Sequence, residues 1–230
     1  MDEVLTLSEA AAYLKLAERT IHRMIQRNEI PCARVGGQWR FMKSVLDDWL
    51  LSRMQVLPRN ELAPLLGATG GIVRLAPMIE ARNVVDPVEP GAPAAVLAQL
   101  VQPLVDQGIV AERSRYVELL LARERLSSTA VGMGVAVPHV RRPQDNPPGA
   151  PAVVLGVCRD GLSFDAPDEK PVHFFFLLSA TSEVVHLRLL KRIMLLFREQ
   201  ETRVALLSCG SPESMLAELN RREAVLFPGG

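Results

Sequence analysis

A break in the hydrophobic pattern between residues 56 and 71 constrains the fold of this chain most. Two prolines and three glycines punctuate the break, and no helical or strand-like period survives it. A length of 230 residues leaves room for one large domain or for two of unequal size. The break therefore predicts a short domain over residues 1–54, a linker over 55–72 and a larger domain over 73–224.

Composition sets limits on what the two domains do. Nearly half of the residues are apolar, which is enough to bury a core. The formal net charge is zero, so any binding of nucleic acid must depend on a local cluster of basic residues. Cys32, Cys158 and Cys209 form no CxxC pair, and we expect reduced thiols with no metal and no other cofactor. The chain shows no leader-type start and no run of 18 apolar residues. We expect a cytoplasmic protein that does not enter a membrane.

The first domain has the pattern of two short helices joined by a tight turn. Thr6 or Ser8 is placed to cap a helix over residues 9–14, a turn follows at 16–17, and a second helix is expected over 18–27. Along the second helix three arginines stand four residues apart and share one face, whereas three apolar side chains form the opposite face. The arginines are Arg19, Arg23 and Arg27, and the apolar residues are Ile21, Met24 and Ile25.

A hairpin is expected after the second helix, because Gly36-Gly37 separates two short extended runs. Arg34 and Arg40 would lie on this basic wing. Between Lys15 and Lys43 there are seven basic residues against two acidic ones, as contacts to DNA phosphates require. The alternative interpretation, that the arginines are only the solvated face of a helix, stays open from the residues alone.

Several separated submotifs of the first domain resemble the excisionase-type winged helix-turn-helix. They are Leu5-Thr-Leu-Ser-Glu-Ala-Ala-Ala-Tyr-Leu, Arg19-Thr-Ile-His-Arg-Met-Ile, Ile30-Pro, Val35-Gly-Gly-Gln-Trp-Arg-Phe and Leu46-Asp-Asp-Trp-Leu. The resemblance implies a mainly α-helical winged domain whose second helix enters the major groove, with Trp39 and Trp49 in the core. It implies DNA contacts from Arg19, Thr20, Arg23, Arg34 and Arg40. Such small modules usually bind weakly alone, so either a homodimer or a neighbouring protein is expected to strengthen the binding.

The second domain alternates helical periods with short apolar runs. Helices are expected over residues 94–107, 115–125, 184–197 and 213–222, with Ser211 capping the last of them. Strands are expected over 135–137, 152–158 and 172–178. Helices interleaved with a few buried strands indicate an α/β or α+β domain.

Among the four histidines, His139 has the surroundings of a reactive group. Pro138 fixes the backbone before it, and the preceding loop carries Gly132 and Gly134. Exposed N–H groups of such a loop would hold an anion beside the ring. A neutral imidazole is nucleophilic near pH 7 and accepts a phosphoryl group. The sequence predicts an open imidazole with an anion site next to it.

The stretch Arg123-Glu-Arg-Leu-Ser-Ser-Thr-Ala-Val-Gly-Met-Gly-Val-Ala-Val-Pro-His139 resembles the active-site motif of the enzyme IIA domains of the fructose/mannitol phosphotransferase systems, nitrogen-regulatory branch. The resemblance implies a mixed sheet flanked by helices. It also implies that His139 accepts a phosphoryl group from an HPr-type carrier, while Arg123 neutralises its oxygens. His186, at a helix start, would be a second site histidine or a solvent-exposed residue, and Thr129 would add a hydroxyl contact. His173 matches no motif and is interpreted as structural.

Three hypotheses follow. The first is a regulator in which phosphorylation of His139 controls DNA binding. The second is a protein-interaction platform that is tethered to DNA and has lost its phosphoryl chemistry. It is motivated by Ala130 and Val140, where the family pattern has glycine, because a branched side chain beside His139 narrows the approach of a partner. In the third, the winged module docks protein and not DNA.

Overall fold

The computed structural model describes residues 4–27, 29–43, 45–46, 49, 74–180 and 183–227. Tertiary contacts divide the chain into two compact units, Met1–Ala68 and Thr69–Gly230, which are called the N-terminal and C-terminal units below. The division falls inside the segment for which a linker is predicted. Most of that segment, and much of the amphipathic run that precedes it, lie outside the described residues.

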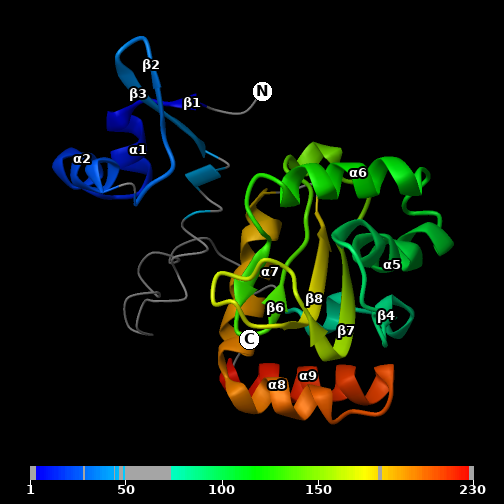
Figure 1. The fold of residues 1–230 in the computed structure, drawn as a ribbon. Coiled ribbons are helices and arrows are strands. Elements are labelled where there is room, and N and C mark those ends of the chain that lie inside the picture. The colour runs from blue at the N-terminus through cyan, green and yellow to red at the C-terminus, as the bar shows by residue number, and fades with distance from the viewer. Residues whose placement is uncertain are drawn as a thin grey trace. The chain divides into compact units, whose positions relative to one another are not determined.

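In the described part of the N-terminal unit, helices α1 and α2 pack against a small antiparallel sheet of order β1-β3-β2 (Figure 1). Its core contains Ile21 and Ile25 from the second helix together with Phe41 and Leu46, and both tryptophans pack against this core as expected. The elements that the structure describes with both bounds are β1 (Val4–Leu5), α1 (Leu7–Tyr13), α2 (Glu18–Gln26), β2 (Ala33–Val35) and β3 (Gln38–Met42).

Local sequence explains both ends of this unit. Thr6 is the N-cap of α1, and with Glu9 it forms a capping box in which each side chain binds the other residue's backbone N–H. These hydrogen bonds lower the pKa of Glu9. At the hairpin, Gly36 and Gly37 both have positive φ, 57° and 80°, which a two-residue turn between antiparallel strands requires. The predicted hairpin is confirmed.

The C-terminal unit is a five-stranded mixed sheet of order β4-β7-β8-β6-β5, with parallel β4/β7 and β6/β8 pairs and antiparallel β7/β8 and β5/β6 pairs. The strands are β4 (Val84–Val85), β5 (Ala130–Gly132), β6 (Val135–Ala136), β7 (Ala152–Leu162) and β8 (Val172–Ser179). The helices are α5 (Pro93–Asp106), α6 (Arg113–Glu124), α7 (Glu183–Arg198), α8 (Gln200–Leu207) and α9 (Pro212–Leu226), with short 3-10 turns at Ala76–Met78, Ala81–Asn83 and Pro143–Asp145.

Strand β8 is apolar at almost every position because both of its faces are covered. Phe175 and Leu177 belong to the core that α5 and α6 share with the sheet. Phe174 and Phe176 alternate with them and meet the ring of Phe197 on α7, at centroid distances of 5.0 and 4.8 Å. In Figure 1, α5 and α7 lie on opposite sides of the β7/β8 pair. The sheet is therefore the middle of three layers.

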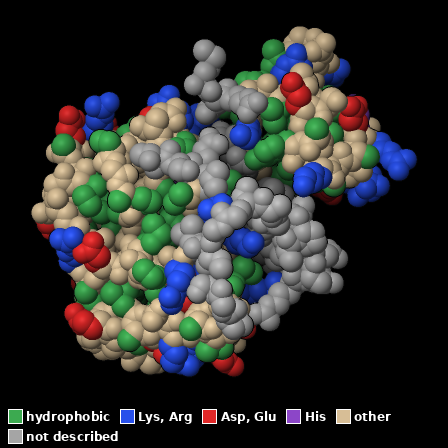
Figure 2. Space-filling view, turned by 180° about the vertical axis from the view of Figure 1, so that it is seen from behind, with side chains coloured by type: hydrophobic (Ala, Val, Ile, Leu, Met, Phe, Trp, Pro, Cys, Tyr) green, Lys and Arg blue, Asp and Glu red, His purple; other side chains and the backbone are tan. Residues whose placement is uncertain are grey.

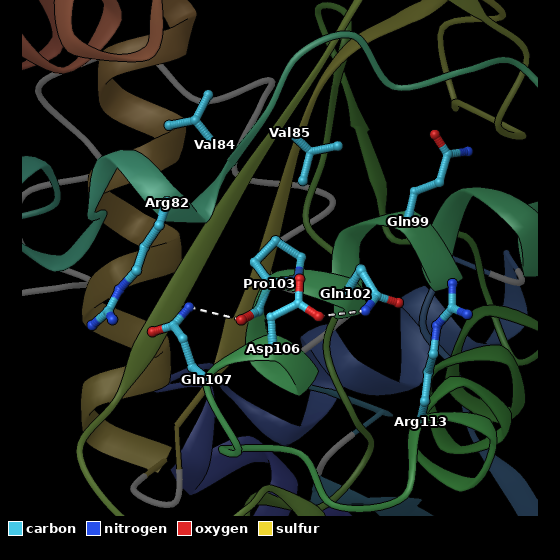
Figure 3. A pocket seen from close by; sticks show the side chains of 9 residues that line it. All are labelled: Arg82, Val84, Val85, Gln99, Gln102, Pro103, Asp106, Gln107 and Arg113. Carbon is cyan, nitrogen blue, oxygen red and sulfur yellow. Dashed lines mark hydrogen bonds between the residues drawn. The ribbon is translucent and has the colours of Figure 1, made fainter.

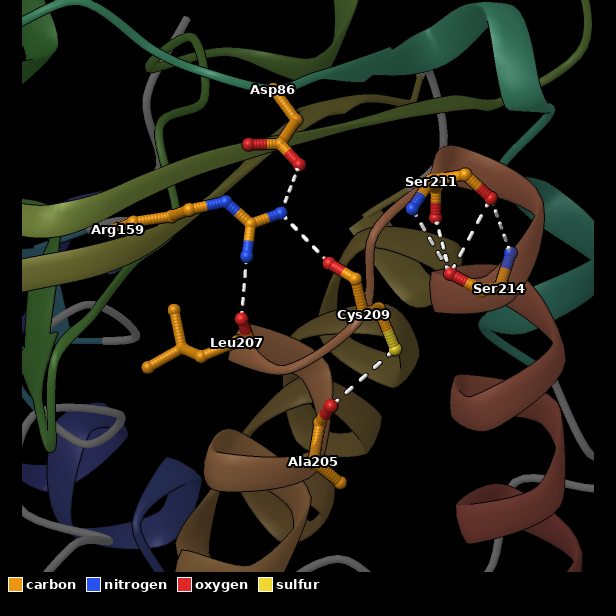
Figure 4. A network of polar contacts seen from close by, with 7 residues as sticks. All are labelled: Asp86, Arg159, Ala205, Leu207, Cys209, Ser211 and Ser214. Atoms are coloured by element: carbon orange, nitrogen blue, oxygen red, sulfur yellow. Dashed lines mark hydrogen bonds and ion pairs between the residues drawn. The ribbon is translucent and has the colours of Figure 1, made fainter.

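Arg159 of β7 connects the sheet to the C-terminal end of α8 through hydrogen bonds (Figure 4). Its guanidinium binds the Asp86 carboxylate at 2.5 Å and donates to the carbonyls of Leu207 and Cys209. A cation at a helix C-terminus satisfies carbonyls that have no partner inside the helix. Ser211 then caps α9 as predicted, and its hydroxyl accepts from the Ser214 N–H.

The structure differs from the sequence-based expectations mainly in short elements. Strands β1, β4 and β5 and helix α8 were not predicted, and α9 runs one turn beyond residue 222. Within the described residues, no helix is both long and apolar enough to cross a membrane. On the face seen in Figure 2, acidic, basic and hydrophobic side chains are interspersed over the larger unit, in keeping with the balanced formal charge.

Candidate functional site

His139 lies just beyond the end of β6, next to the central strand of the sheet. An isolated parallel bridge pairs it with Leu178 near the end of β8, and the Leu178 N–H donates to the carbonyl of Pro138. The backbone at His139 is therefore held by the sheet and not by a surface loop.

Two contacts define the chemistry of the His139 ring. Its Nδ1 lies 2.8 Å from the carbonyl oxygen of Val137, and its Nε2 lies 3.2 Å from Nε of Arg123. A carbonyl only accepts and a guanidinium only donates, so Nδ1 carries the proton and Nε2 presents its lone pair. This tautomer belongs to a neutral imidazole whose nucleophilic atom is Nε2.

Arg123 comes from the last turn of α6 and is itself buried. Besides its contact to His139, Nη1 donates to the carbonyl of Ser127 at 2.8 Å. The predicted pairing of Arg123 with His139 is confirmed. The predicted openness of the ring is wrong, because His139 is only 8% exposed. The arginine lies at Nε2 of the ring and covers it.

His186 lies against the His139 ring, at a centroid distance of 4.6 Å and an interplanar angle of 56°. It belongs to the first turn of α7, where backbone N–H groups lack partners inside the helix. It is partly buried, so it is not simply a solvated residue at a helix start. The structure brings Arg123, His139 and His186 together.

Glu124, the residue after Arg123, organises the loop that leads into β5. Its carboxylate accepts from the Thr129 N–H at 3.0 and 3.1 Å, from the Thr129 hydroxyl at 2.5 Å and from the Ser128 hydroxyl at 2.8 Å. The Thr129 hydroxyl hydrogen is therefore directed to the Glu124 carboxylate. Thr129 positions the loop, and Glu124 is a site residue that sequence reasoning missed, although it stands next to Arg123 in the motif.

The glycine-bearing turn is not the anion site that the sequence suggested. Gly134 packs against His173 of β8, whereas His139 pairs with Leu178 on the same strand. Five residues of strand separate the two places by about 17 Å. The N–H of Met133 in this turn donates to the Asp168 carboxylate at 2.8 Å. The turn shapes the far end of β6, and the prediction of backbone donors beside His139 is wrong.

The residue after His139 faces the core. Val140 is buried among the residues that α5, α6 and the sheet enclose, so the expectation that it narrows a partner's approach is wrong. The following loop is tied down by Asn146, which accepts from the Tyr116 hydroxyl at 2.8 Å and donates to the Ala180 carbonyl at 2.8 Å. Burial raises the pKa of Tyr116 to about 12.

His173 has a structural position, as interpreted from the sequence. Its Nδ1 lies 3.2 Å from the carbonyl oxygens of Cys158 and Arg159 on the neighbouring strand. A Cβ atom added at Gly161 would lie 2.7 Å from its ring, so glycine is needed there to admit the imidazole.

In the N-terminal unit, the arginines predicted to contact DNA fall into two groups. Arg19 and Arg23 are exposed on α2, opposite the buried Ile21 and Ile25, and Arg27, which was not among the predicted contacts, is exposed at the C-cap of this helix. The two wing arginines also make contacts within the hairpin: Arg34 lies over the Trp39 ring, and Arg40 donates to the Trp39 carbonyl and to Gln38. Thr20 is partly buried on α2.

A separate cavity of about 560 Å³ lies between α5 and the edge strand β4 (Figure 3). Its polar side chains already bind one another or the backbone, since Gln102 donates to Asp106 and Gln107 donates to the Pro103 carbonyl. None of the predicted site residues lines it. Among the described residues there is also no group of three histidine, cysteine, aspartate or glutamate side chains placed to hold a metal ion.

Comparisons with known proteins identify both units. The family model described as "Phosphoenolpyruvate-dependent sugar phosphotransferase system, EIIA 2" matches residues 80–222. The model described as "Helix-turn-helix domain" matches residues 4–54.

Curated relatives match over the C-terminal unit. The fructose-specific EIIABC component of Bacillus subtilis is 31% identical over 130 residues, which is 56% of this chain and 20% of that protein. The chain thus spans only a fifth of that relative. A nitrogen regulatory protein of Pseudomonas aeruginosa is 36% identical over 102 residues, 43% of this chain and 63% of that protein.

Solved structures agree. The nitrogen regulatory protein IIA-Ntr of Neisseria meningitidis superposes with a TM-score of 0.56 at 27% identity, covering 63% of this chain and 97% of that one. The mannitol IIA of Escherichia coli gives 0.54 at 20% identity over 61% of this chain and 98% of that one, which shows the shared fold. The chain belongs to the EIIA type 2 family of the phosphotransferase system, with a helix-turn-helix domain in front of its EIIA domain.

Proposed function

We propose that this protein is a regulator in which a phosphoryl group on His139 controls the binding of the N-terminal unit to DNA. The observation that carries the proposal is the Arg123–His139 pair, in which a guanidinium N–H points at the lone pair of a neutral imidazole. The joining of a helix-turn-helix domain to an EIIA domain supports a regulator over a transport component.

Phosphoryl transfer at this site takes place at Nε2 of His139. The Nε2–P bond forms as the P–N bond of a donor phosphohistidine breaks, and the bonding pair returns to the donor nitrogen. A donor ring that carries a proton on its other nitrogen leaves as neutral imidazole. The His139 ring becomes positively charged, and the Val137 carbonyl stabilises its Nδ1–H. No proton has to move during the transfer.

Arg123 has a role before and after transfer. At rest its Nε–H occupies the lone pair of His139, and attack requires that this N–H moves to an oxygen of the incoming phosphoryl group. The planar guanidinium then neutralises charge on the transferring oxygens. His186, in the first turn of α7, adds a ring donor beside a helix N-terminus, which favours an anion.

The donor that fits this chemistry is a histidine-bearing carrier of the HPr type. DNA is the partner that fits the N-terminal unit, because the exposed arginines of α2 provide cations on the face that a major groove receives. A homodimer would double that contact. The alternative of an inert platform loses its main support, since Ala130 and Val140 are buried in the core and do not obstruct the ring.

The test uses the full chain and two phosphoryl sources, potassium phosphoramidate and a phosphoenolpyruvate–enzyme I–HPr relay. We expect mass spectrometry under alkaline handling to find one phosphoryl group on His139. The His139→Ala variant should gain none, and His22→Ala, which changes an exposed histidine, should label as the wild type does. Equal labelling of the wild type and His139→Ala would refute the carrier.

The second half of the test measures affinity for a duplex that the wild type selects from a random pool. We expect phosphorylation to change this affinity in the wild type and to leave it unchanged in His139→Ala. A labelled protein whose affinity stays the same, or one that selects no duplex, contradicts the regulator.

A further inference from the structure

Glu223 is a buried carboxylate that the phosphoryl site does not use. It lies on α9, is 2% exposed, and its oxygens accept from the N–H groups of Leu75 and Ala76 at 2.7 and 3.1 Å. Arg192 of α7 completes the set, with Nε 2.9 Å from the same carboxylate. A buried charge is retained only where donors of this kind surround it. These four residues are called the Glu223 clamp.

The clamp holds the chain at the entry to the C-terminal unit. Arg74, Leu75 and Ala76 are the first described residues of the C-terminal unit, and Arg74 binds the Asn220 amide oxygen at 2.5 Å. Asn220 stands three residues before Glu223, on the same face of α9. One helix therefore fixes three consecutive residues, 74–76.

The clamp also reaches the helix that carries His186. Arg192 lies six residues after His186 along α7, a rise of about 9 Å. The Arg192 guanidinium lies 3.8 Å from the centroid of the Phe227 ring, just after α9. The helix thus contacts the His139 ring at its start and the clamp near its middle.

We propose that the Glu223 clamp couples the phosphorylation state of His139 to the segment that leads to the N-terminal unit. A phosphoryl group beside His186 brings nearly two negative charges to the start of α7. A shift of α7 changes the position of Arg192, and with it the hold of Glu223 on Leu75 and Ala76. The proposal rests on the function proposed above and specifies how the signal leaves the site.

Hydrogen exchange of the full chain, before and after treatment with phosphoramidate, tests the coupling. We expect the Leu75 and Ala76 amides to exchange at least tenfold faster or slower once His139 carries the phosphoryl group. In treated His139→Ala they should not change. Unchanged exchange of these amides in a protein whose His139 is labelled overturns the proposal.

A matched pair of variants separates coupling from stability. Glu223→Gln removes the charge from the clamp, whereas Glu218→Gln removes a carboxylate on the same helix that binds Arg221 and Arg222 near the surface. We expect Glu223→Gln to accept the label but to lose the effect of phosphorylation on DNA affinity, and Glu218→Gln to keep it. A full response in Glu223→Gln overturns the proposal.

A third variant covers the case in which Glu223→Gln does not fold. Asn220→Ala removes only the exposed partner of Arg74, so it should fold and should speed exchange at residues 74–76 by a smaller factor. Exchange equal to that of the wild type contradicts the clamp. Failure to label His139 at all refutes the carrier itself, which is a different outcome from labelling without coupling.

Discussion

The two units place their cationic side chains in opposite ways. In the N-terminal unit the arginines of α2 are exposed and share one face. In the C-terminal unit Arg123 and Arg192 are buried, and their contacts include the His139 ring and the Glu223 carboxylate, respectively. An exposed cation acts through a field that salt screens, whereas a buried one acts through geometry. Arginine is therefore part of an exposed basic surface in the N-terminal unit and of defined buried contacts in the C-terminal unit.

Replacing the buried arginine of the site tests the comparison most strongly. Arg123→Met keeps most of the side-chain length but removes the charge at Nε2. We expect the rate of His139 phosphorylation to fall about 10²- to 10³-fold, the typical cost of losing one preorganised transition-state donor. The initial rate of labelling by phosphoramidate measures it. Arg125→Met, at the exposed neighbouring arginine, is the control and should label at nearly the wild-type rate.

Replacing the exposed arginines should produce a response of a different kind. For Arg19→Ala combined with Arg23→Ala, we expect the slope of log affinity for DNA against log salt to fall by about 2, since each lost phosphate contact accounts for about 0.9. Fluorescence anisotropy between low and moderate salt measures the slope. Arg115→Ala, an exposed arginine of α6, should leave it unchanged. An unaltered slope in the double variant would favour protein docking by this unit.

The smallest expected effect is a difference between the two units in how their stability against unfolding depends on pH. The pKa of Tyr116 is raised from 10.0 to about 12 by burial, so the stability that its neutral hydroxyl contributes is present below pH 10 and is lost as pH rises towards 12. Tyr116→Phe should remove this alkaline loss and cost about 1–3 kcal/mol at neutral pH, because Asn146 loses a buried donor. Thermal unfolding against pH measures both.

The N-terminal unit should lose stability at acid pH. The pKa of Glu9 is lowered by its hydrogen bonds to Thr6, so its contribution is present above the ordinary value of 4.5 and is lost as pH falls through the lowered one. Thr6→Ala should weaken this acid response and leave the alkaline one intact. A common pH profile for both variants would show that the two units do not unfold independently.

Sequence patterns located the long elements and missed the short ones for a physical reason. Helix α5 and strand β8 each bury several side chains. Elements of this length repeat their buried positions often enough for the pattern to be recognised in the sequence. Strand β4 has two residues and β5 has three, too few for a period. Helix α8 follows α7 after a single residue, so its pattern merges with the tail of the longer helix.

The site residues that belong to one sequence motif could be predicted. The contacts between residues that are distant in the sequence and belong to no motif could not. Arg123 and His139 follow from the resemblance, and the structure brings them together. The burial of the ring could not be read from sequence, because Arg123 and His186 cover it from elements 16 and 47 positions away. Arg192 and Glu223 belong to no motif, and only the packing of α7 on α9 joins them.

The hydrogen bond from His139 to the carbonyl of Val137 has a consequence for diversification. It lies within one short stretch of backbone at the end of β6, so Nε2 of His139 takes its position from the sheet. Sequence changes in the loop over residues 143–151 should therefore leave Nε2 of His139 in place while they alter the surface around it.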